Sequence, residues 1–375
     1  MAQKFSIVLD FGSEKISAML GSRGVNGTFK IKGMADVNYS GFMNGQFIDP
    51  SELKIAIGSV LNLLESSSKV ETRSLYIGVP AEFCAVVVGT GETHFRKSKA
   101  IRVSDVAEIC GKAMPQTYEK THTIINQAPI FFVLDDTRKV LNPVGEVSSS
   151  LSASISYVLA NRSFLSQISS IMRDIGIYDF KFISSTLAEC VYLIDEETRN
   201  KFAVLIDVGH ITTSVSLIRG DGILNLASFS EGGGNITADL CECLNIKYSE
   251  AEALKRKLIL SLDASESDVY EIEIKGQTRP INAKMANEVV KARIERLASL
   301  IQKCFASFSF EIPQNVAVFL TGGGLSELKG AKDFLSKAIA MPLEIAKNPD
   351  LTIRKPSYAS LLGLLNMALL SEDNN

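Results

Sequence analysis

Short apolar runs followed by small and acidic residues recur along the chain. The run AVLI at 203–206 leads into Asp207, and a second run, SVSLI, follows at 214–218 after a loop of small and polar residues. Apolar runs of this length bounded by aspartate and glycine are typical of buried strands. The pattern predicts a β-hairpin over 202–219 with an acidic residue where its tip begins, and a third strand over 223–229.

A copy of this hairpin lies near the N-terminus. The segment FSIVLDFGSEKISAMLGSRG aligns without a gap with FAVLIDVGHITTSVSLIRGDG, so that Asp10 matches Asp207 and Gly12 matches Gly209. Backbone N–H groups in such small-residue tips bind phosphate, and the carboxylate can face a metal ion. Because an internal repeat indicates repeated architecture, we predict two α/β lobes that close on one ligand. Two unrelated hairpins with acidic turns are the alternative.

Glycine runs follow two more predicted strands. Gly232–Gly234 precede a helix expected near Thr237, and Thr321 with Gly322–Gly324 lead from the run VAVFL to a helix expected near Ser326. Glycine lets a backbone approach a phosphate or a flat ring closely, and a helix N-terminus favours an anion. One glycine run is weak support for a nucleotide site, whereas several loops of this kind support one another.

The segment from Glu92 to about Leu159 differs from its surroundings. It begins with the basic run ETHFRKSKAIRV, a helix is expected from Val103, and strands are expected in HTIINQ, IFFVLD and SASISYVL. We predict a small inserted subdomain here. The basic run is interpreted as a solvated edge rather than a binding patch.

The composition of the chain argues against several classes of protein. The 375 residues allow roughly two domains or one two-lobed body, and 46% hydrophobic residues indicate a large folded core. A formal net charge of −3 gives no electrostatic reason to expect nucleic acid as a partner. The 6 cysteines show no CxxC spacing, so reduced thiols are expected. We expect neither a signal peptide before the first strand nor a membrane-spanning helix, which needs ~20 apolar residues.

Four motifs carry a family resemblance: DFGS at 10–13, DVG at 207–209, GGGN at 232–235 and LTGGG at 320–324. In this order they resemble the actin/Hsp70/sugar-kinase ATPase superfamily. Within it the chain is similar to the FtsA family of actin-like bacterial cell division proteins, on SFSEGGGNITADLCECLNI, YSEAEALKRK, QTRPINAKMANEVVKARIERL, LTGGGLSELKGAKDFL and KPSYASLLGLL. The resemblance implies an α/β, actin-like (ribonuclease H-like), duplicated two-lobed fold with a 1C-type (SHS2-like) inserted subdomain.

Four subdomains follow from the resemblance. Their expected boundaries are 1–85 with 160–198 and 350–375 for subdomain 1A, 86–159 for 1C, 199–235 with 305–349 for 2A, and 236–304 for 2B.

The resemblance also implies ATP or ADP with Mg²⁺ between the lobes. Asp10 and Asp207 would hold Mg²⁺ through water. The residues expected around the nucleotide are Gly12, Ser13, Lys15, Gly209, Thr212, Thr213, Gly233, Gly234, Glu252, Lys255, Gly322, Gly323 and Gly324. For Glu252 and Lys255 an exposed i, i+3 ion pair is the alternative. Ser249 with Glu252 also fits a capping box.

The second hairpin tip departs from the family pattern Asp-x-Gly-Gly-Gly-Thr-Thr-Asp. His210 and Ile211 replace two glycines, and Ser214 replaces a carboxylate. If residue 211 took a positive φ, its β-branched side chain would be strained by about 1–3 kcal/mol. We therefore expect weakened nucleotide binding and at most weak ATPase activity. The His210 side chain is expected to turn to solvent, and a role as catalytic base is the alternative.

The resemblance implies a cell division scaffold that polymerises head to tail into protofilaments. It would link the tubulin-like FtsZ ring to the division machinery at the inner face of the cell membrane, with downstream division proteins as further partners. Arg293 and the surrounding helix are the expected docking surface for the FtsZ C-terminal peptide.

Members of the family usually continue into a linker and an amphipathic membrane helix. This sequence ends at 371–375 before such a segment, so membrane contact is expected through a tail beyond it or through a partner. The main alternative is a PilM-like or other cytoplasmic actin-fold adaptor with weak or no nucleotide binding. A small-molecule kinase of the same superfamily is less favoured, because no motif supplies a general-base carboxylate facing a substrate pocket.

Overall fold

The computed structural model describes residues 5–25, 28–115, 120–274, 277–350 and 353–373. The described chain forms two five-stranded sheets and a separate four-stranded sheet, with helices against each. The residues MAQK that precede the first strand lie outside the described part. No described helix is both long enough and apolar enough to cross a membrane.

The first lobe is built on the sheet with strand order β11-β6-β1-β2-β3. Its strands are β1 Ser6–Phe11, β2 Lys15–Arg23, β3 Phe29–Asn38, β6 Ser74–Val79 and β11 Asp179–Ser184, and the short pair β4 Phe42–Met43 and β5 Gln46–Phe47 lies beside them. Its helices are α1 Pro50–Ser68, α3 Arg162–Asp174, α4 Ser185–Leu193 and α10 Ala359–Asp373.

The second lobe is built on the sheet with strand order β14-β13-β12-β17-β18. Its elements are β12 Ala203–Val208, β13 Thr213–Arg219, β14 Gly222–Phe229, β17 Ala317–Thr321, β18 Glu344–Ile345, α5 Glu196–Asn200, α8 Ala283–Ser307 and α9 Ala331–Ile339. Its distal part contains α6 Gly233–Leu244, α7 Tyr248–Lys255 and the hairpin of β15 Val269–Ile274 with β16 Gln277–Asn282.

The two sheets share one topology. In each, a hairpin is followed by a third antiparallel strand, and a parallel strand borders the first strand of the hairpin: β6 pairs with β1, and β17 pairs with β12. The register also repeats, because Asp10 lies opposite Ser17 and Asp207 lies opposite Ser214. The duplication predicted from the sequence is therefore present in three dimensions.

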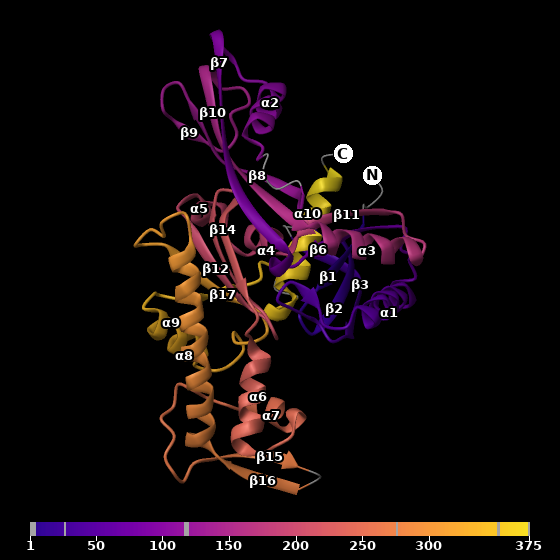
Figure 1. Ribbon diagram of the computed structural model, residues 1–375, viewed down its shortest axis with the longest axis vertical. Helices are drawn as coiled ribbons and strands as arrows, with labels where there is room; N and C mark the ends of the chain where they lie inside the picture. Colours follow the sequence, from indigo (N-terminus) through magenta and orange to yellow (C-terminus); the bar gives the residue numbers. More distant parts are fainter. Residues whose placement is uncertain (1–4, 26–27, 116–119, 275–276, 351–352, 374–375) are drawn as a thin grey trace.

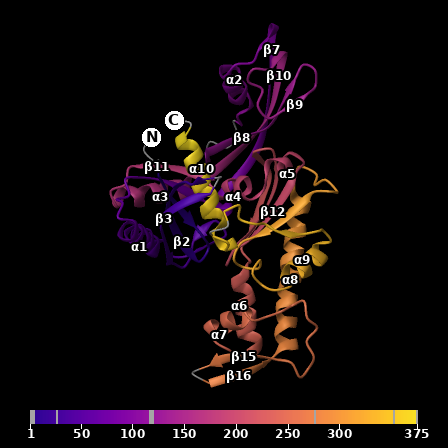
Figure 2. The ribbon, with the colours of Figure 1, turned by 180° about the vertical axis from the view of Figure 1, so that it is seen from behind.

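The inserted subdomain consists of β7 Cys84–Ala100, α2 Val103–Ala113, β8 His122–Leu134, β9 Lys139–Val140 and β10 Val147–Asn161. It lies at one end of the elongated molecule, and α7 with the β15–β16 hairpin lies at the other (Figures 1 and 2). The subdomain rests on the second lobe, where the Ser156 hydroxyl donates to the Ile223 carbonyl over 2.6 Å. The strands expected separately in HTIINQ and IFFVLD are one strand, β8.

Buried apolar side chains explain the helix positions. Asp49 caps helix α1, because its carboxylate accepts from the N–H groups of Ser51 and Glu52. The helix buries Leu53, Val60 and Leu64. The last helix, α10, is core-packed as its apolar sequence predicts. Helix α4 lies between the two sheets and packs against both.

Two predicted helix starts are wrong. Helix α6 starts at Gly233 rather than near Thr237, because the Asn235 side chain accepts from the Gly232 N–H and caps the helix there. Helix α9 starts at Ala331 rather than near Ser326. A run of turns occupies the residues between Gly322 and Ala331.

Candidate functional site

The two hairpin tips have the same backbone geometry. The Gly12 N–H donates to the Lys15 carbonyl over 2.9 Å, and the Gly209 N–H donates to the Thr212 carbonyl over 2.8 Å. A Cβ on either glycine would lie 3.0 Å from the carbonyl oxygen it faces. Both positions therefore favour glycine for the same physical reason, a close approach of the backbone to itself.

A cavity of about 510 Å³ lies between the tips. It brings together thirteen of the residues predicted from the sequence: Asp10, Gly12, Ser13, Lys15, Asp207, Gly209, Thr212, Thr213, Glu252, Lys255, Gly322, Gly323 and Gly324. A volume of this size matches the clefts that hold small organic ligands.

Gly233 and Gly234, also predicted, do not line this cavity. Their N–H groups donate to the carbonyls of Gly209 and His210 over 2.8 and 2.7 Å. A Cβ on Gly233 would lie 2.5 Å from the Cα of Gly324. These two glycines therefore pack the start of α6 against the loops behind the cavity.

The loop after β17 supports the second aspartate. Gly322 has φ +87°, and a Cβ there would lie 2.2 Å from Oδ1 of Asp207. The Gly324 N–H donates to the Val208 carbonyl over 2.8 Å. Only glycine at 322 combines this positive φ with the space that the Asp207 carboxylate needs.

Both predicted metal-binding aspartates lie in an environment that disfavours charge. Burial raises the pKa of Asp10, although the Ser185 hydroxyl donates to its Oδ1 over 2.9 Å and opposes the shift. Burial and then the nearby charge of Asp10 raise the pKa of Asp207 to about 7. Within the residues described, no group of three or more His, Cys, Asp or Glu side chains has the geometry to ligate a metal ion directly.

Glu189 on α4 is a site residue that the sequence reasoning missed. It is only 3% exposed and lines the cavity. Its nearest hydrogen-bond partner is the Thr321 hydroxyl, at 3.5 Å. Burial, followed by the charges of Asp207 and Asp10, raises the pKa of Glu189 well above its usual value. A charged residue inside the apolar helix pattern SSTLAECVYL was the available signal.

Lys15 supplies positive charge at the first tip. Its Nζ lies 3.2 Å from the carboxylate of Asp36 and 4.1 Å from the centre of the Tyr358 ring. Lys355, Ser357 and Ser360 reach the cavity beside Tyr358 from the last part of the chain. Their approach depends on the docking of α10, so local sequence pattern gave no indication of it.

The predicted capping box at the start of α7 is wrong. Glu250 accepts from the Lys247 N–H over 2.9 Å, which leaves Glu252 free to pair with Lys255 at 2.7 Å. The Lys255 Nζ also donates to the Gly233 carbonyl over 2.9 Å. The pair lies in the cavity wall with side chains 24% and 12% exposed, so the alternative of an exposed surface pair is wrong too.

His210 does not turn to solvent as predicted. Its side chain is 23% exposed, with Nδ1 3.3 Å from the Glu14 carboxylate and Nε2 3.0 Å from the Tyr248 hydroxyl. Neither His210 nor Ile211 has a positive φ, so the strain considered for residue 211 is absent. His210 and Ile211 therefore fit the loop without the positive φ angles that the glycines of the family pattern suggested.

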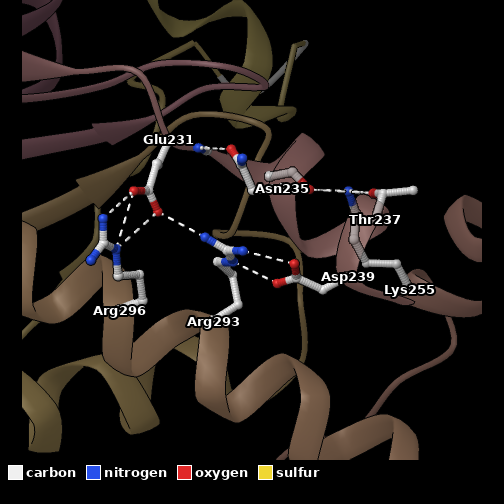
Figure 3. Close-up of polar contacts among 9 residues, drawn as sticks. Glu231, Asn235, Thr237, Asp239, Lys255, Arg293 and Arg296 are labelled. Atoms are coloured by element: carbon white, nitrogen blue, oxygen red, sulfur yellow. Dashed lines mark hydrogen bonds and ion pairs between the residues drawn. The ribbon is translucent and has the colours of Figure 1, made fainter. Parts of the chain in front are cut away.

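Arg293 lies away from the cavity, on α8. Its guanidinium donates to both carboxylate oxygens of Asp239 on α6 and to Glu231, the latter over 2.8 Å (Figure 3). Arg296, one turn later, also pairs with Glu231 at 2.9 Å. The predicted docking residue is thus 21% exposed and held in an ion-pair network that joins α8 to the middle of α6 and to Glu231, which precedes α6.

Comparison with known sequences identifies relatives of the chain. The family model described as cell division protein FtsA matches residues 204–363. Cell division protein FtsA of Bacillus subtilis (strain 168) is 20% identical over 368 residues, which cover 96% of this chain and 83% of that protein. The FtsA of Pseudomonas aeruginosa is 20% identical over 380 residues, covering 99% of this chain and 91% of that protein.

Comparison with solved structures identifies the fold. A PilM–PilN type IV pilus biogenesis complex matches with a TM-score of 0.64 and 16% identity, over 97% of this chain and 98% of the other. MreB 5 of Spiroplasma citri bound to AMPPNP matches with a TM-score of 0.57 and 11% identity, over 99% and 98%. A MamK double helical filament matches with a TM-score of 0.52 and 14% identity, over 97% and 98%. The predicted actin-like fold is confirmed, as is the resemblance to FtsA.

Proposed function

Because this chain resembles FtsA along nearly its whole length and has the actin-like fold, we propose that it is a nucleotide-binding scaffold of bacterial cell division. The observation that carries the proposal is the cavity between two equivalent Asp-x-Gly tips, one from each lobe. MreB 5, which shares the fold, was solved with AMPPNP. We assign ATP or ADP to this cavity.

The groups around the cavity fit a phosphate chain with Mg²⁺. Two acidic side chains, Asp10 and Asp207, face a buried space in which their charges repel, and a divalent cation relieves that repulsion. Mg²⁺ would be held through water by these carboxylates and would neutralise phosphate charge. Lys15 adds a positive charge at the first tip, and Thr212 and Thr213 supply hydroxyl groups at the second.

The remaining predicted residues suit the nucleoside part. Glu252 and Lys255 form one wall of the cavity and Gly322–Gly324 another, and we assign the base and ribose to the space between them. Ser214 provides no carboxylate opposite Asp207 to orient attacking water. We therefore propose at most weak ATPase activity and a role for the nucleotide in assembly.

Calorimetry with Mg²⁺ tests nucleotide binding. The proposal predicts micromolar binding of ATP or ADP by the wild type and its loss in Asp10→Ala. Asp174→Ala is the control, because that aspartate pairs with Lys54 on the surface at 2.8 Å and should leave binding unchanged. Absence of wild-type binding at millimolar nucleotide would mean that the fold serves as a nucleotide-independent scaffold.

We propose self-assembly into protofilaments as the second part of the function. MamK, which shares the fold, was solved as a double helical filament. Sedimentation and electron microscopy with Mg²⁺ and ATP should show filaments. A protein that stays monomeric at all concentrations, with and without nucleotide, contradicts this part of the proposal.

We propose the FtsZ C-terminal peptide as a partner, docked near Arg293 on α8 at the division site. A carboxylate of the peptide would compete with Asp239 and Glu231 for the guanidinium (Figure 3). Arg293→Ala should weaken peptide binding, whereas Lys291→Ala on the same helix serves as the matched control. No binding of the peptide to the wild type would count against the division role.

A PilM-like adaptor is the second candidate, because the PilM–PilN complex matches with a TM-score of 0.64. An adaptor of this kind would bind a short peptide from a membrane partner and need no nucleotide. Binding of such a peptide, together with failure to bind the FtsZ peptide, would favour it.

A further inference from the structure

The two residues that replace family glycines at the second tip both contact the first lobe. His210 places its ring between Glu14 of the first tip and Tyr248 of α7, at 3.3 and 3.0 Å. The Ile211 N–H donates to the Ser13 hydroxyl over 2.9 Å. Consecutive residues of one tip therefore hold the other tip by a side chain and by the backbone.

These contacts are related by the internal repeat. In the gapless alignment of the hairpins, Ser13 corresponds to His210, and Glu14 corresponds to Ile211. Ser13 contacts Ile211, and His210 contacts Glu14. The same pair of positions thus meets twice, once in each direction, as in a contact about a two-fold axis.

The glycine run before α6 is fitted to this arrangement. A Cβ on Gly234 would lie 2.7 Å from Nε2 of His210, and a Cβ on Gly232 would lie 2.6 Å from the His210 carbonyl oxygen. The Gly234 N–H donates to that carbonyl over 2.7 Å. Glycine at 232 and 234 is therefore needed for the imidazole and its backbone to occupy their place.

Both ring nitrogens of His210 have a hydrogen-bond partner when the imidazole is neutral. With its proton on Nδ1, the imidazole faces the Glu14 carboxylate with a donor, and Nε2 accepts from the Tyr248 hydroxyl. Burial lowers the pKa of His210, which favours this neutral form. Glu14 and His210 both line the cavity, so the linked side chains form part of its wall.

We propose that His210 is a clamp that ties the first tip to α7 and thereby slows the passage of ligand into and out of the cavity. His210 is a positioning residue in this account, not a catalytic one. Separation of the lobes breaks both tip-to-tip contacts, so the clamp slows the entry and the exit of ligand alike. It therefore changes the rate of ligand exchange more than the equilibrium affinity. The consequence for nucleotide exchange rests on the nucleotide binding proposed above.

Two variants and one matched control test the clamp. His210→Gly restores the glycine of the family pattern, and Tyr248→Phe removes only the hydroxyl. His94→Ala is the control, because that histidine is exposed in β7 and pairs only with Glu92 among its ionic contacts in the described chain. Thermal unfolding of each variant verifies that the fold is intact.

Hydrogen exchange without nucleotide measures the clamp directly. Amides in peptides covering 9–16 and 208–214 should exchange about tenfold faster in His210→Gly and a few-fold faster in Tyr248→Phe, because contacts that close the tips are lost. Exchange in the control should match the wild type. Unchanged protection in His210→Gly overturns the proposal.

Stopped-flow displacement of a fluorescent N-methylanthraniloyl ADP measures the consequence. The dissociation rate should rise about tenfold in His210→Gly while the equilibrium constant changes less than about threefold. An unchanged dissociation rate overturns the role in exchange. If the wild type binds no nucleotide, the proposed function fails, and hydrogen exchange alone decides whether the clamp exists.

Discussion

The two hairpin tips are equal in backbone and unequal in chemistry. Each has an aspartate, a glycine two residues later and the same hydrogen bond across the turn. The first tip adds the charge of Lys15, and a hydroxyl, that of Ser185, donates to its aspartate. The second tip has Thr212 where the first has Lys15. Its aspartate, Asp207, lies so close to Gly322 that there is no room for a Cβ there.

The two copies of the repeat share the features that determine the fold and differ in the side chains available for binding. Hydrogen bonds of the turn and the strand register depend on the backbone and on glycine, and both copies retain them. Charge is concentrated on the first tip, whereas His210 and Ile211 of the second tip form contacts with the first lobe. We infer that the first tip binds phosphate and that the second tip mainly closes the site.

The largest expected effect is on the pH dependence of stability, which tests the difference between the two aspartates. Because burial and the Asp10 charge raise the pKa of Asp207 from 3.8 to about 7, the folded state retains this proton to a higher pH than the unfolded chain. The free energy of unfolding therefore falls as pH rises from about 4 to about 7. Asp207→Asn should remove the contribution of this residue to the fall and stabilise the protein at pH 8 by about 2–4 kcal/mol.

Denaturant unfolding at pH 5 and pH 8, without metal or nucleotide, measures this effect. Asp10→Asn should stabilise less, because the Ser185 hydroxyl already donates to that carboxylate. Equal gains from the two substitutions would contradict the difference between the tips.

A second prediction concerns the charge at the first tip. Lys15→Ala should weaken Mg²⁺–ADP binding about tenfold, as expected for loss of a charge-assisted contact. Thr212→Ala, at the equivalent position of the second tip, should weaken it about threefold or less. Calorimetry on the two variants gives the ratio, and a larger effect from Thr212 would reverse the assignment of roles.

The smallest expected effect tests what the tips share. Gly12→Ala and Gly209→Ala each place a Cβ 3.0 Å from a carbonyl oxygen, so each should destabilise by about 1 kcal/mol. The two losses should agree within about 0.5 kcal/mol. Thermal unfolding measured side by side checks this, and a clear inequality would show that the backbones are not equivalent.

Sequence pattern predicted the features that depend on local chemistry. Apolar runs and the repeat around Asp10 and Asp207 predicted two α/β lobes that close on one ligand. The actin-like fold and most cavity-lining residues were implied by the resemblance to FtsA that these motifs and the glycine loop at 322–324 carry. The spacing of hydrophobic residues and the local composition indicate which residues are buried and where the chain turns. These signals suffice for the two hairpins because each hairpin is built from residues close in the chain.

The features that were missed depend on contacts between distant residues. Glu189 reaches the cavity only because α4 lies between the two sheets. His210 is held by Tyr248, 38 positions later, and by the other tip. No local pattern encodes such pairings, which is why His210 was expected in solvent. The capping box failed for a local reason, because Lys247 rather than Ser249 is the N-cap of α7 and Glu250 rather than Glu252 caps it.

The central claim is that both lobes bind one nucleotide between their tips. Titration of Mg²⁺–ADP into the wild type, Asp10→Ala and Asp207→Ala by calorimetry tests it most directly. We predict one binding site per chain in the wild type and loss of binding in both variants. Full binding in either variant would show that one lobe alone holds the nucleotide and would contradict the account.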